Sequence, residues 1–295
     1  MAGVKAPEQR IGPQEYLKEV TVKQVLLFTA FIFCLVARPA IKEAKTMNEA
    51  LSSVDNDTVL IFDLDNTIIE TIQALGSDQW VDYLKEKYRK EYGETGESEE
   101  AIKAKVLVKV LDDWKRVVRV TKVQPVEETT PELIRGLQAK GVRIMGLTAR
   151  PVDLIGRTRS QLESVRVDLS KSTVSPEEFT LATSPDVDFR AKFSGGILHS
   201  GNNPKGPLLT KFLLEKLKLQ PKKIVFVDDK KGNVESVEAA LNKIQGLDHT
   251  SYRYGGADKK VAGFRKELAE IEWEYFRAIL SDSAAQAILV GGLNR

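Results

Sequence analysis

Short apolar runs stand out at three widely separated places in the chain. They cover residues 58–62 (TVLIF), 142–147 (VRIMGL) and 223–227 (KIVFV), and none shows the polar alternation of a strand with one face in water. A strand that helices cover on both faces reads instead as a nearly continuous apolar run. The pattern therefore predicts three buried, parallel β-strands.

Helical patterns separate these strands. Thr129-Thr130-Pro131 predicts a helix start with a threonine cap and a proline in the first turn, and Gly141 predicts its end. Two further helices are predicted by the spacing of Leu209, Phe212, Leu213 and Leu217 after Pro207, and of Val234, Val237, Leu241 and Ile244 after the third strand. Alternating strands and helices predict an α/β fold with a doubly wound parallel sheet.

Two insertions and a C-terminal tail complete the predicted organisation. Residues 77–120 are charged and carry one apolar stripe that includes Val110 and Trp114, which predicts a helical cap. Residues 151–200 hold a second insertion, with a hairpin expected around Gly195-Gly196. An amphipathic pattern beyond Gly256 predicts a C-terminal helix that packs back on the domain. We assign residues 41–76 and 121–295 to the core and 77–120 to the cap.

An apolar run near the N-terminus raises the question of export. Val25 to Ala37 (VLLFTAFIFCLVA) follows Lys18 and Lys23. A spanning helix needs about 20 apolar residues, whereas the core of a signal peptide needs about 7–15. We expect residues 1–40 to be a signal peptide or membrane anchor, which places the protein in the periplasm, outside the cell or on a membrane. The alternative is a cytoplasmic protein in which this run is a buried helix.

Composition narrows the classes of partner. The chain has 44 Lys and Arg against 42 Asp and Glu, so no global field favours nucleic acid. The single cysteine, Cys34, lies in the N-terminal run and follows the bulky Phe33, which argues against a lipoprotein signal. No disulfide or thiolate metal site is expected in the rest of the chain.

Polar residues follow each of the three predicted strands. The first run leads into Asp63-Leu64-Asp65-Asn66-Thr67, the second into Thr148-Ala149-Arg150 and the third into Asp228-Asp229, while Lys205 precedes the Pro207 helix. Open α/β sheets bind ligands at the carboxyl ends of their strands. The three strand ends are therefore expected to meet at one site.

This order of motifs resembles the haloacid dehalogenase superfamily, whose members carry DxDxT, a strand ending in Ser or Thr, a lysine near a helix start and a strand ending in paired acids. The resemblance implies that Asp63 is the nucleophile, Asp65 the general acid and base, and Thr148, Ala149 and Lys205 the binding site for phosphoryl oxygens. It also implies a Mg²⁺ site made of Asp63, the main-chain carbonyl of Asp65, and Asp228. Asp229 is expected to orient Lys205 or a metal-bound water.

The chemistry explains these residue types. A carboxylate can attack a doubly negative phosphomonoester only if cations screen its approach, and Mg²⁺ prefers oxygen ligands. Asp65 points to phosphoryl chemistry, because dehalogenases and phosphonatases of the superfamily lack this second acid. A calcium loop is excluded by Ile68 and Ala74, which stand where glycine and glutamate are needed.

The expected function is a Mg²⁺-dependent phosphomonoesterase that forms an aspartyl-phosphate. Its substrate would be a phosphorylated small molecule or a phosphoprotein. A phosphomutase uses the same four motifs and is the enzymatic alternative. A different class, an effector or binding protein that uses the cap and the C-terminal helix to dock a partner, also stays open.

Within the superfamily, the chain from about Ala44 onward is similar to a bacterial family once described as outer-membrane proteins. The similarity rests on the segments DLDNT, GSDQW, LTAR, VDDKKGNV and WEYF. Some relatives of that kind are thought to be protein-tyrosine phosphatases, which implies phosphotyrosine as one substrate to test. The segment GSDQW follows the nucleophile where a cap would begin, so Trp80 is expected to line the substrate pocket.

Overall fold

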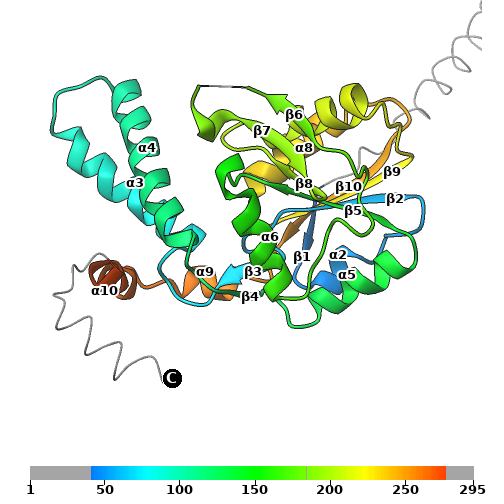
Figure 1. Ribbon diagram of the computed structural model, residues 1–295, viewed down its shortest axis with the longest axis horizontal. Helices are drawn as coiled ribbons and strands as arrows, with labels where there is room; N and C mark the ends of the chain where they lie inside the picture. The colour runs from blue at the N-terminus through cyan, green and yellow to red at the C-terminus, as the bar shows by residue number, and fades with distance from the viewer. Residues whose placement is uncertain (1–40, 184, 277–295) are drawn as a thin grey trace, which may run out of the picture. The chain divides into compact units, whose positions relative to one another are not determined.

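The computed structural model describes residues 41–183 and 185–276, and an eight-stranded sheet lies at their centre (Figure 1). The strands, in spatial order, are β1 (Lys42–Ala44), β10 (Asp248–Tyr254), β9 (Lys223–Asp228), β2 (Thr58–Phe62), β5 (Arg143–Thr148), β8 (Ile197–His199), β7 (Ala191–Ser194) and β6 (Phe179–Ala182). In this spatial order the first six strands, from β1 to β8, are parallel to one another. Strand β7 pairs antiparallel with β8, and β6 pairs antiparallel with β7. The predicted α/β class with a mainly parallel sheet is confirmed.

The three strands predicted from apolar runs occupy the middle of the sheet, where β9, β2 and β5 are neighbours. All five residues of β2 are buried. Leu60 and Phe62 contribute to one core cluster and Val59 and Ile61 to a second one, so successive side chains enter two different cores. Burial on both faces explains why this strand shows no polar alternation.

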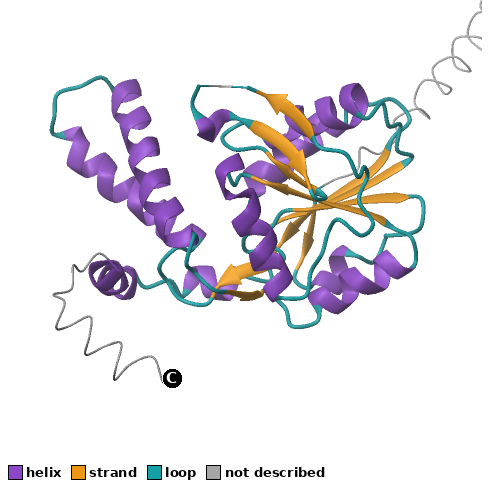
Figure 2. Cartoon of the chain, in the orientation of Figure 1, coloured by secondary structure: helices purple, strands orange, loops and turns teal. Residues whose placement is uncertain are grey.

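Helices cover both faces of the sheet (Figure 2). The first core cluster includes residues from α2 (Met47–Ala50), α5 (Thr130–Ala139) and α6 (Ile155–Ser164). The second includes residues from α7 (Lys205–Thr210), its π-helical continuation η3 (Lys211–Lys216) and α8 (Lys231–Leu241). This arrangement is the doubly wound one that the alternation of patterns predicts.

The helix ends differ in detail from the predicted ones. Thr129 occupies the capping position before α5, as predicted, but its backbone is already helical and its side chain makes no capping hydrogen bond. Gly141 does follow that helix with φ +82°, a conformation that glycine adopts without strain. The helix predicted from Pro207 begins two residues earlier, at Lys205.

The second insertion contains the expected hairpin. Gly195 and Gly196 connect β7 to β8 and have φ values of +58° and +81°. A Cβ atom on Gly196 would lie 2.3 Å from the carbonyl oxygen of Leu169, so glycine is needed there for space as well as for backbone conformation. Short 3₁₀ turns, η1 (Val152–Leu154) and η2 (Val187–Phe189), complete this region.

A helical hairpin leaves the core through a small antiparallel ribbon of β3 (Ile69–Thr71) and β4 (Val123–Pro125) (Figure 1). It consists of α3 (Asp78–Gly93) and α4 (Glu99–Val118), which lie inside the segment predicted as a cap. Ser77 and Ser98 cap these two helices through their side chains. We call α3 and α4 the cap.

The C-terminal part of the described chain corrects the predicted division into core and cap. After the short helix α9 (Asp258–Ala262), helix α10 (Lys266–Phe276) packs into the hydrophobic cluster of the cap through Ala269 and Trp273. The Trp80 and Trp273 ring centroids are 5.3 Å apart. Residues 121–295 therefore do not all belong to the core.

A membrane-spanning helix is not found among the described residues, since none of their helices combines the necessary length with the necessary apolar character. The run from Val25 to Ala37, on which the predicted signal peptide or anchor depends, lies outside the described residues.

Candidate active site

The carboxyl ends of the central strands converge on one cavity of about 170 Å³. Phe62 at the end of β2 lies opposite Val227 of β9, and the Asp63 amide donates a hydrogen bond of 2.8 Å to the Val227 carbonyl. Parallel register thus brings residues more than 100 positions apart to the same edge of the sheet. The predicted site residues among those lining the cavity are Asp63, Asp65, Thr148, Ala149 and Lys205.

A buried ion cluster forms the floor of this site. The Lys205 ammonium lies 2.5 Å from Asp63 Oδ1 and 2.6 Å from Asp228 Oδ2. Burial by itself lowers the pKa of Lys205, but the Asp228 and Asp63 carboxylates outweigh burial and raise it above its ordinary value. Lys205 is therefore a permanent positive charge beside the expected nucleophile.

Two carboxyl groups of the cluster hold protons more tightly than usual. Burial raises the pKa of Asp63 to about 7, against the opposing charge of Lys205. Burial, followed by the negative charges of Asp63 and Asp78, raises the pKa of Asp229 to about 9. Perturbed acids of this kind gather at functional sites, because one lysine cannot neutralise several buried carboxylates.

The same carboxylates fit a hard divalent cation. One oxygen from each of Asp63, Asp228 and Asp229 lies within 4.8 Å of the others. The Asp229 Oδ1 atom is buried and has no hydrogen-bond partner. Asp228 is oriented by the Lys230 amide at 2.8 Å and by the Asn233 side chain at 3.1 Å. Clustered carboxylate oxygens with surplus negative charge suit Mg²⁺.

Asp65 is held by an arginine for which the sequence suggested no role. Arg150 donates from Nε to Asp65 Oδ2 at 2.7 Å and from Nη2 to Asp65 Oδ1 at 2.6 Å. The arginine side chain is only 1% exposed, while the Asp65 side chain is 20% exposed toward the cavity. The one available signal was the position of Arg150, two residues after Thr148 at the end of the second strand.

Thr148 is the last residue of β5 and is buried. Its hydroxyl oxygen accepts a hydrogen bond of 3.2 Å from the Arg150 amide. The same strand end is fixed from the other side, because the Ser200 amide donates to the Thr148 carbonyl at 2.8 Å. Rigid anchoring of this kind suits a residue that binds a phosphoryl oxygen.

Trp80 does not lie where the sequence placed it. Its side chain is fully buried in the cap, against Trp273, and it is not among the residues that line the cavity. The neighbouring positions Asp78 and Val81 line the cavity instead. Asp78 also forms an ion pair of 2.8 Å with Lys230 of the core. The expected substrate contact of Trp80 is therefore replaced by packing inside the cap.

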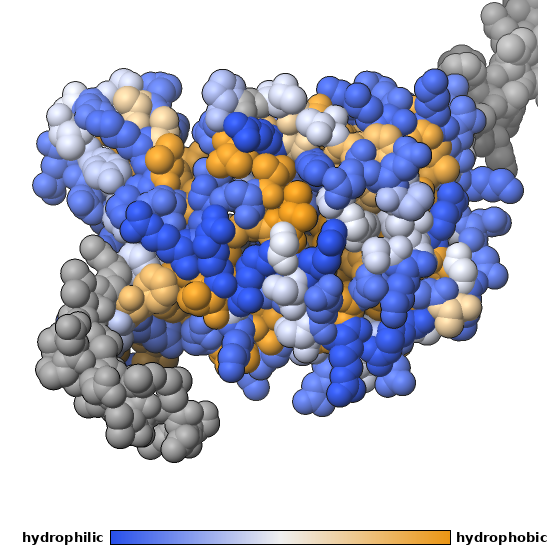
Figure 3. All heavy atoms as spheres, in the orientation of Figure 1, coloured by the Kyte–Doolittle hydropathy of each residue, from blue (hydrophilic) through white to orange (hydrophobic). Residues whose placement is uncertain are grey.

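The cap supplies an apolar wall to the cavity. Leu107, Val110, Leu111 and Trp114, all from α4, line it opposite the charged floor. Figure 3 shows a largely hydrophilic face on which apolar side chains gather between the cap and the sheet domain. The cavity is therefore polar where the strands end and apolar where the cap covers it.

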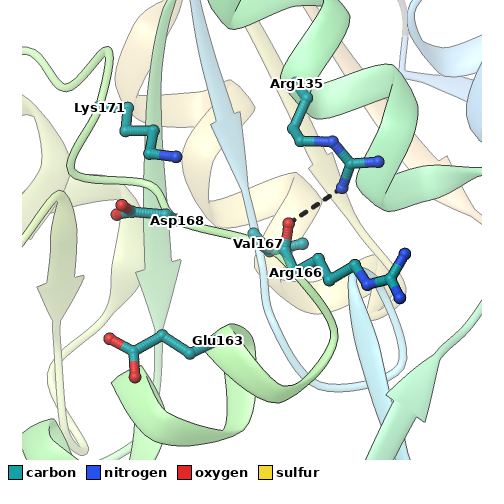
Figure 4. A pocket seen from close by; sticks show the side chains of 6 residues that line it. All are labelled: Arg135, Glu163, Arg166, Val167, Asp168 and Lys171. Carbon is teal, nitrogen blue, oxygen red and sulfur yellow. Dashed lines mark hydrogen bonds between the residues drawn. The ribbon is translucent and has the colours of Figure 1, made fainter.

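A larger depression, of about 470 Å³, lies between α5 and the segment after α6 (Figure 4). Its lining alternates in charge, with Arg135, Arg166 and Lys171 beside Glu163 and Asp168. None of the strand-end residues takes part in it. It is also the more open of the two. We therefore place the candidate active site in the smaller cavity.

Comparison with known proteins connects the chain to bacterial relatives. A Chlamydia pneumoniae protein provisionally named as an outer membrane protein is 26% identical over 91% of this chain and 98% of its own length. A Chlamydia trachomatis protein with the same provisional name is 24% identical over 86% of this chain and 95% of its own. These names confirm the resemblance to a bacterial family once described as outer-membrane proteins.

Among solved structures, a haloacid dehalogenase-like hydrolase from Streptococcus pneumoniae is similar, with 14% identity over 71% of this chain and 99% of that one. The TM-score of 0.39 is too low to transfer that protein's properties to this chain. A profile of the family described as "Protein of unknown function (DUF2608)" matches residues 40–286, which is most of the chain. The chain therefore belongs to the DUF2608 family.

Proposed function

We propose that this protein is a Mg²⁺-dependent phosphomonoesterase that forms an aspartyl-phosphate on Asp63. The observation that carries the proposal is the buried cluster in which Lys205 contacts both Asp63 and Asp228, with Asp65 on the same cavity. A carboxylate nucleophile beside a fixed ammonium group and a second carboxyl group has the parts that phosphoryl transfer needs.

In the first half-reaction, an Asp63 oxygen attacks the phosphorus atom in line with the leaving group. The new oxygen–phosphorus bond forms as the ester bond breaks, and Asp65 gives its proton to the departing alkoxide. Lys205 and Thr148 hold the negative oxygens of the transferring group. In the second half-reaction, Asp65 takes a proton from the water that attacks the aspartyl-phosphate, which releases phosphate and restores Asp63.

The metal would be held by Asp63, Asp228 and the main-chain carbonyl of Asp65, with Asp229 close by. When bound, Mg²⁺ supplies positive charge that offsets repulsion between the nucleophile and the phosphoryl group. Support comes from the cluster of three acids and from the raised pKa values of Asp63 and Asp229. A cation of charge two would complement the negative charge that Lys205 leaves uncompensated.

The cavity favours a compact leaving group with an apolar face. Leu107, Leu111 and Trp114 offer few hydrogen-bond partners, whereas a sugar or nucleotide would present several hydroxyl groups to that wall. An aryl phosphate fits this division, with its phosphoryl group on the charged floor and its ring against α4. Phosphotyrosine, free or in a phosphoprotein, is one such substrate.

Export or membrane attachment is part of the proposal. It is supported by the apolar run from Val25 to Ala37 and by the provisional outer-membrane names of the chlamydial relatives. Cell fractionation followed by N-terminal sequencing tests it: a shortened chain means a cleaved signal, and an intact chain in membranes means an anchor. An intact chain in the cytoplasm would contradict the proposed location.

The test of the activity is a screen of phosphorylated compounds with the full chain, with and without Mg²⁺. The panel should include nitrophenyl phosphate, phosphotyrosine peptides, sugar phosphates and nucleotides. We expect Mg²⁺-dependent phosphate release that is highest for the aryl phosphates and absent in Asp63→Asn. Release that survives exhaustive chelation, or that equals wild type in Asp63→Asn, would contradict the proposal. Transfer of phosphate between positions of a sugar, without release, would identify a phosphomutase.

A further inference from the structure

We propose that Arg150 and Gln161 form a positioning relay that holds Asp65 in its working orientation and connects it to the base of the cap. This inference rests on the proposed function, because it assigns Asp65 the role of acid and base. It adds a role for Arg150, which the sequence placed only at a strand end, a role for Gln161, which lies outside the sequence motifs, and a physical connection between the proton donor and the cap.

The first half of the relay is the fork between Arg150 and Asp65. Two parallel hydrogen bonds of 2.7 and 2.6 Å fix the plane of the carboxyl group as well as its position. The fork uses one lone pair on each oxygen, so the others stay free to face the cavity.

The second half is the support of Arg150 by helix α6. The remaining guanidinium nitrogen, Nη1, donates to Gln161 Oε1 at 2.6 Å and to Thr158 Oγ1 at 3.4 Å. Arg150, Thr158 and Gln161 are all buried, with at most 2% of each residue exposed. A buried guanidinium group with every nitrogen engaged cannot rotate without breaking several charge-assisted bonds.

Gln161 reaches onward to the cap. Its amide nitrogen Nε2 donates to the carbonyl of Thr121 at 2.8 Å and, more weakly, to that of Val118 at 3.4 Å. Val118 is the last residue of α4, and Thr121 lies between α4 and β4. Glutamine suits this place because it accepts from Arg150 at one atom and donates to the cap from the other.

The base of the cap is tightly packed at this point. Gly76, on the other chain segment that enters the cap, lies so close that a Cβ atom there would be 2.8 Å from Val117 Cγ1. The Gly76 carbonyl also accepts a hydrogen bond of 3.1 Å from the Trp114 ring nitrogen. A shift of α4 therefore changes the positions of the carbonyl groups that Gln161 binds.

Helix α4 links this base to the substrate, because the same helix carries the apolar wall of the cavity. Only two side chains, Arg150 and Gln161, lie between the α4 terminus and the Asp65 carboxyl group. Contiguous packed and hydrogen-bonded groups of this kind carry coupling between sites. The position of the cap over its substrate and the orientation of the Asp65 carboxyl group are therefore connected.

The chain provides a matched control in Arg157. Its guanidinium group donates to the same two carbonyls, at 2.6 Å to Thr121 and 3.1 Å to Val118. None of the hydrogen bonds described for Arg157 goes to Arg150 or Asp65. Arg157→Ala therefore loosens the base of the cap without touching the relay, while Gln161→Met removes the relay and preserves the side-chain length.

The experiment measures kcat/KM for two substrates: phenyl phosphate, whose leaving group needs a proton, and nitrophenyl phosphate, whose leaving group does not. The quantity compared between variants is the value for phenyl phosphate divided by the value for nitrophenyl phosphate. Asp65→Asn should lower the ratio of the two values by about 100-fold, as expected for loss of a general acid. Gln161→Met should lower the same ratio by about 10-fold, because misplaced catalytic groups lose much of their effect. Arg157→Ala leaves the hydrogen bonds of Arg150 and Gln161 in place, so it should lower the ratio by much less than Gln161→Met does.

A second variant covers the case in which Gln161→Met does not fold, which a melting curve reveals. Arg150→Lys keeps the charge but not the fork, so it should lower the ratio in the same direction. An unchanged ratio in the folded variants, or an equal change in Arg157→Ala, would overturn the relay and leave the phosphatase activity standing. No Mg²⁺-dependent turnover by the wild-type chain on either substrate would overturn the proposed function and the relay together.

Discussion

Lys205 Nζ lies 2.5 Å from Asp63 Oδ1, although the two residues are 142 positions apart in the chain. The contact exists because α7 begins at Lys205 beside the carboxyl end of β2, and both side chains are less than 10% exposed. A buried ammonium group in contact with two carboxylates sets the charge of the whole site. Removing either partner should therefore change activity and stability together.

Asp63→Asn should lower turnover by at least about 1,000-fold, because the nearly isosteric amide cannot attack phosphorus. Circular dichroism should show an unchanged fold. Asp57→Asn, at an exposed position just before β2, is the matched control and should retain wild-type rates. Steady-state kinetics with nitrophenyl phosphate makes the comparison. Wild-type-like turnover in Asp63→Asn would mean that another group is the nucleophile.

Lys205→Met should remove activity and also destabilise the fold, by about 3 kcal/mol, because Asp63 and Asp228 lose their buried counter-charge. The double variant Lys205→Met/Asp228→Asn should recover part of that stability and none of the activity. Urea denaturation measures the stability of both variants, and phosphate release measures their activity. If Lys205→Met is as stable as wild type, the ion cluster does not contribute the expected free energy of unfolding.

Mg²⁺ should stabilise the protein more at about pH 8 than at about pH 6. The folded-state pKa values of Asp63 and Asp229, about 7 and about 9, lie above the ordinary value of 3.8. The folded state therefore binds more protons, and the contribution of these groups to metal-free stability falls as pH rises through this range. Mg²⁺ binds the ionised carboxylates, so its effect should grow as those protons leave.

Thermal melts at both pH values, with Mg²⁺ and with chelator, measure this effect. Asp229→Asn should raise the metal-free melting temperature at about pH 8 by about 2–4 °C, since the folded protein then no longer has to keep this carboxyl group protonated at a pH far above the ordinary value of its pKa. Asp228→Ala should weaken Mg²⁺ binding more than Asp229→Ala does. A larger Mg²⁺ effect at low pH would contradict the assignment of these acids.

Leu107→Glu should raise KM for aryl phosphates by about 10-fold, because a negative charge on the apolar wall repels the substrate and leaves a polar group poorly solvated. Val108→Glu is the matched control. Val108 is the next residue of α4 but is 60% exposed and does not line the cavity. An equal effect of both substitutions would show that general charge on α4, and not the cavity wall, governs binding.

Much of the candidate site could be predicted from the sequence because each motif sits at the end of a strongly apolar strand. Parallel strands covered on both faces must bring their carboxyl ends to one edge, so Asp63, Thr148 and Asp228 had to approach one another once β2, β5 and β9 were recognised. The order of the motifs along the chain then assigned their chemistry by resemblance. This reasoning depends only on local pattern and topology.

The tertiary structure alone decided the partners of single side chains. Trp80 belongs to a helix with apolar residues on more than one side, and only the docking of α10 showed which side was covered. The role of Arg150 depends on Gln161, a residue in a polar helix pattern with no signal of its own. Periodicity identifies which face of an element is buried, but hydrogen-bond partners depend on how distant elements pack, which local sequence does not encode.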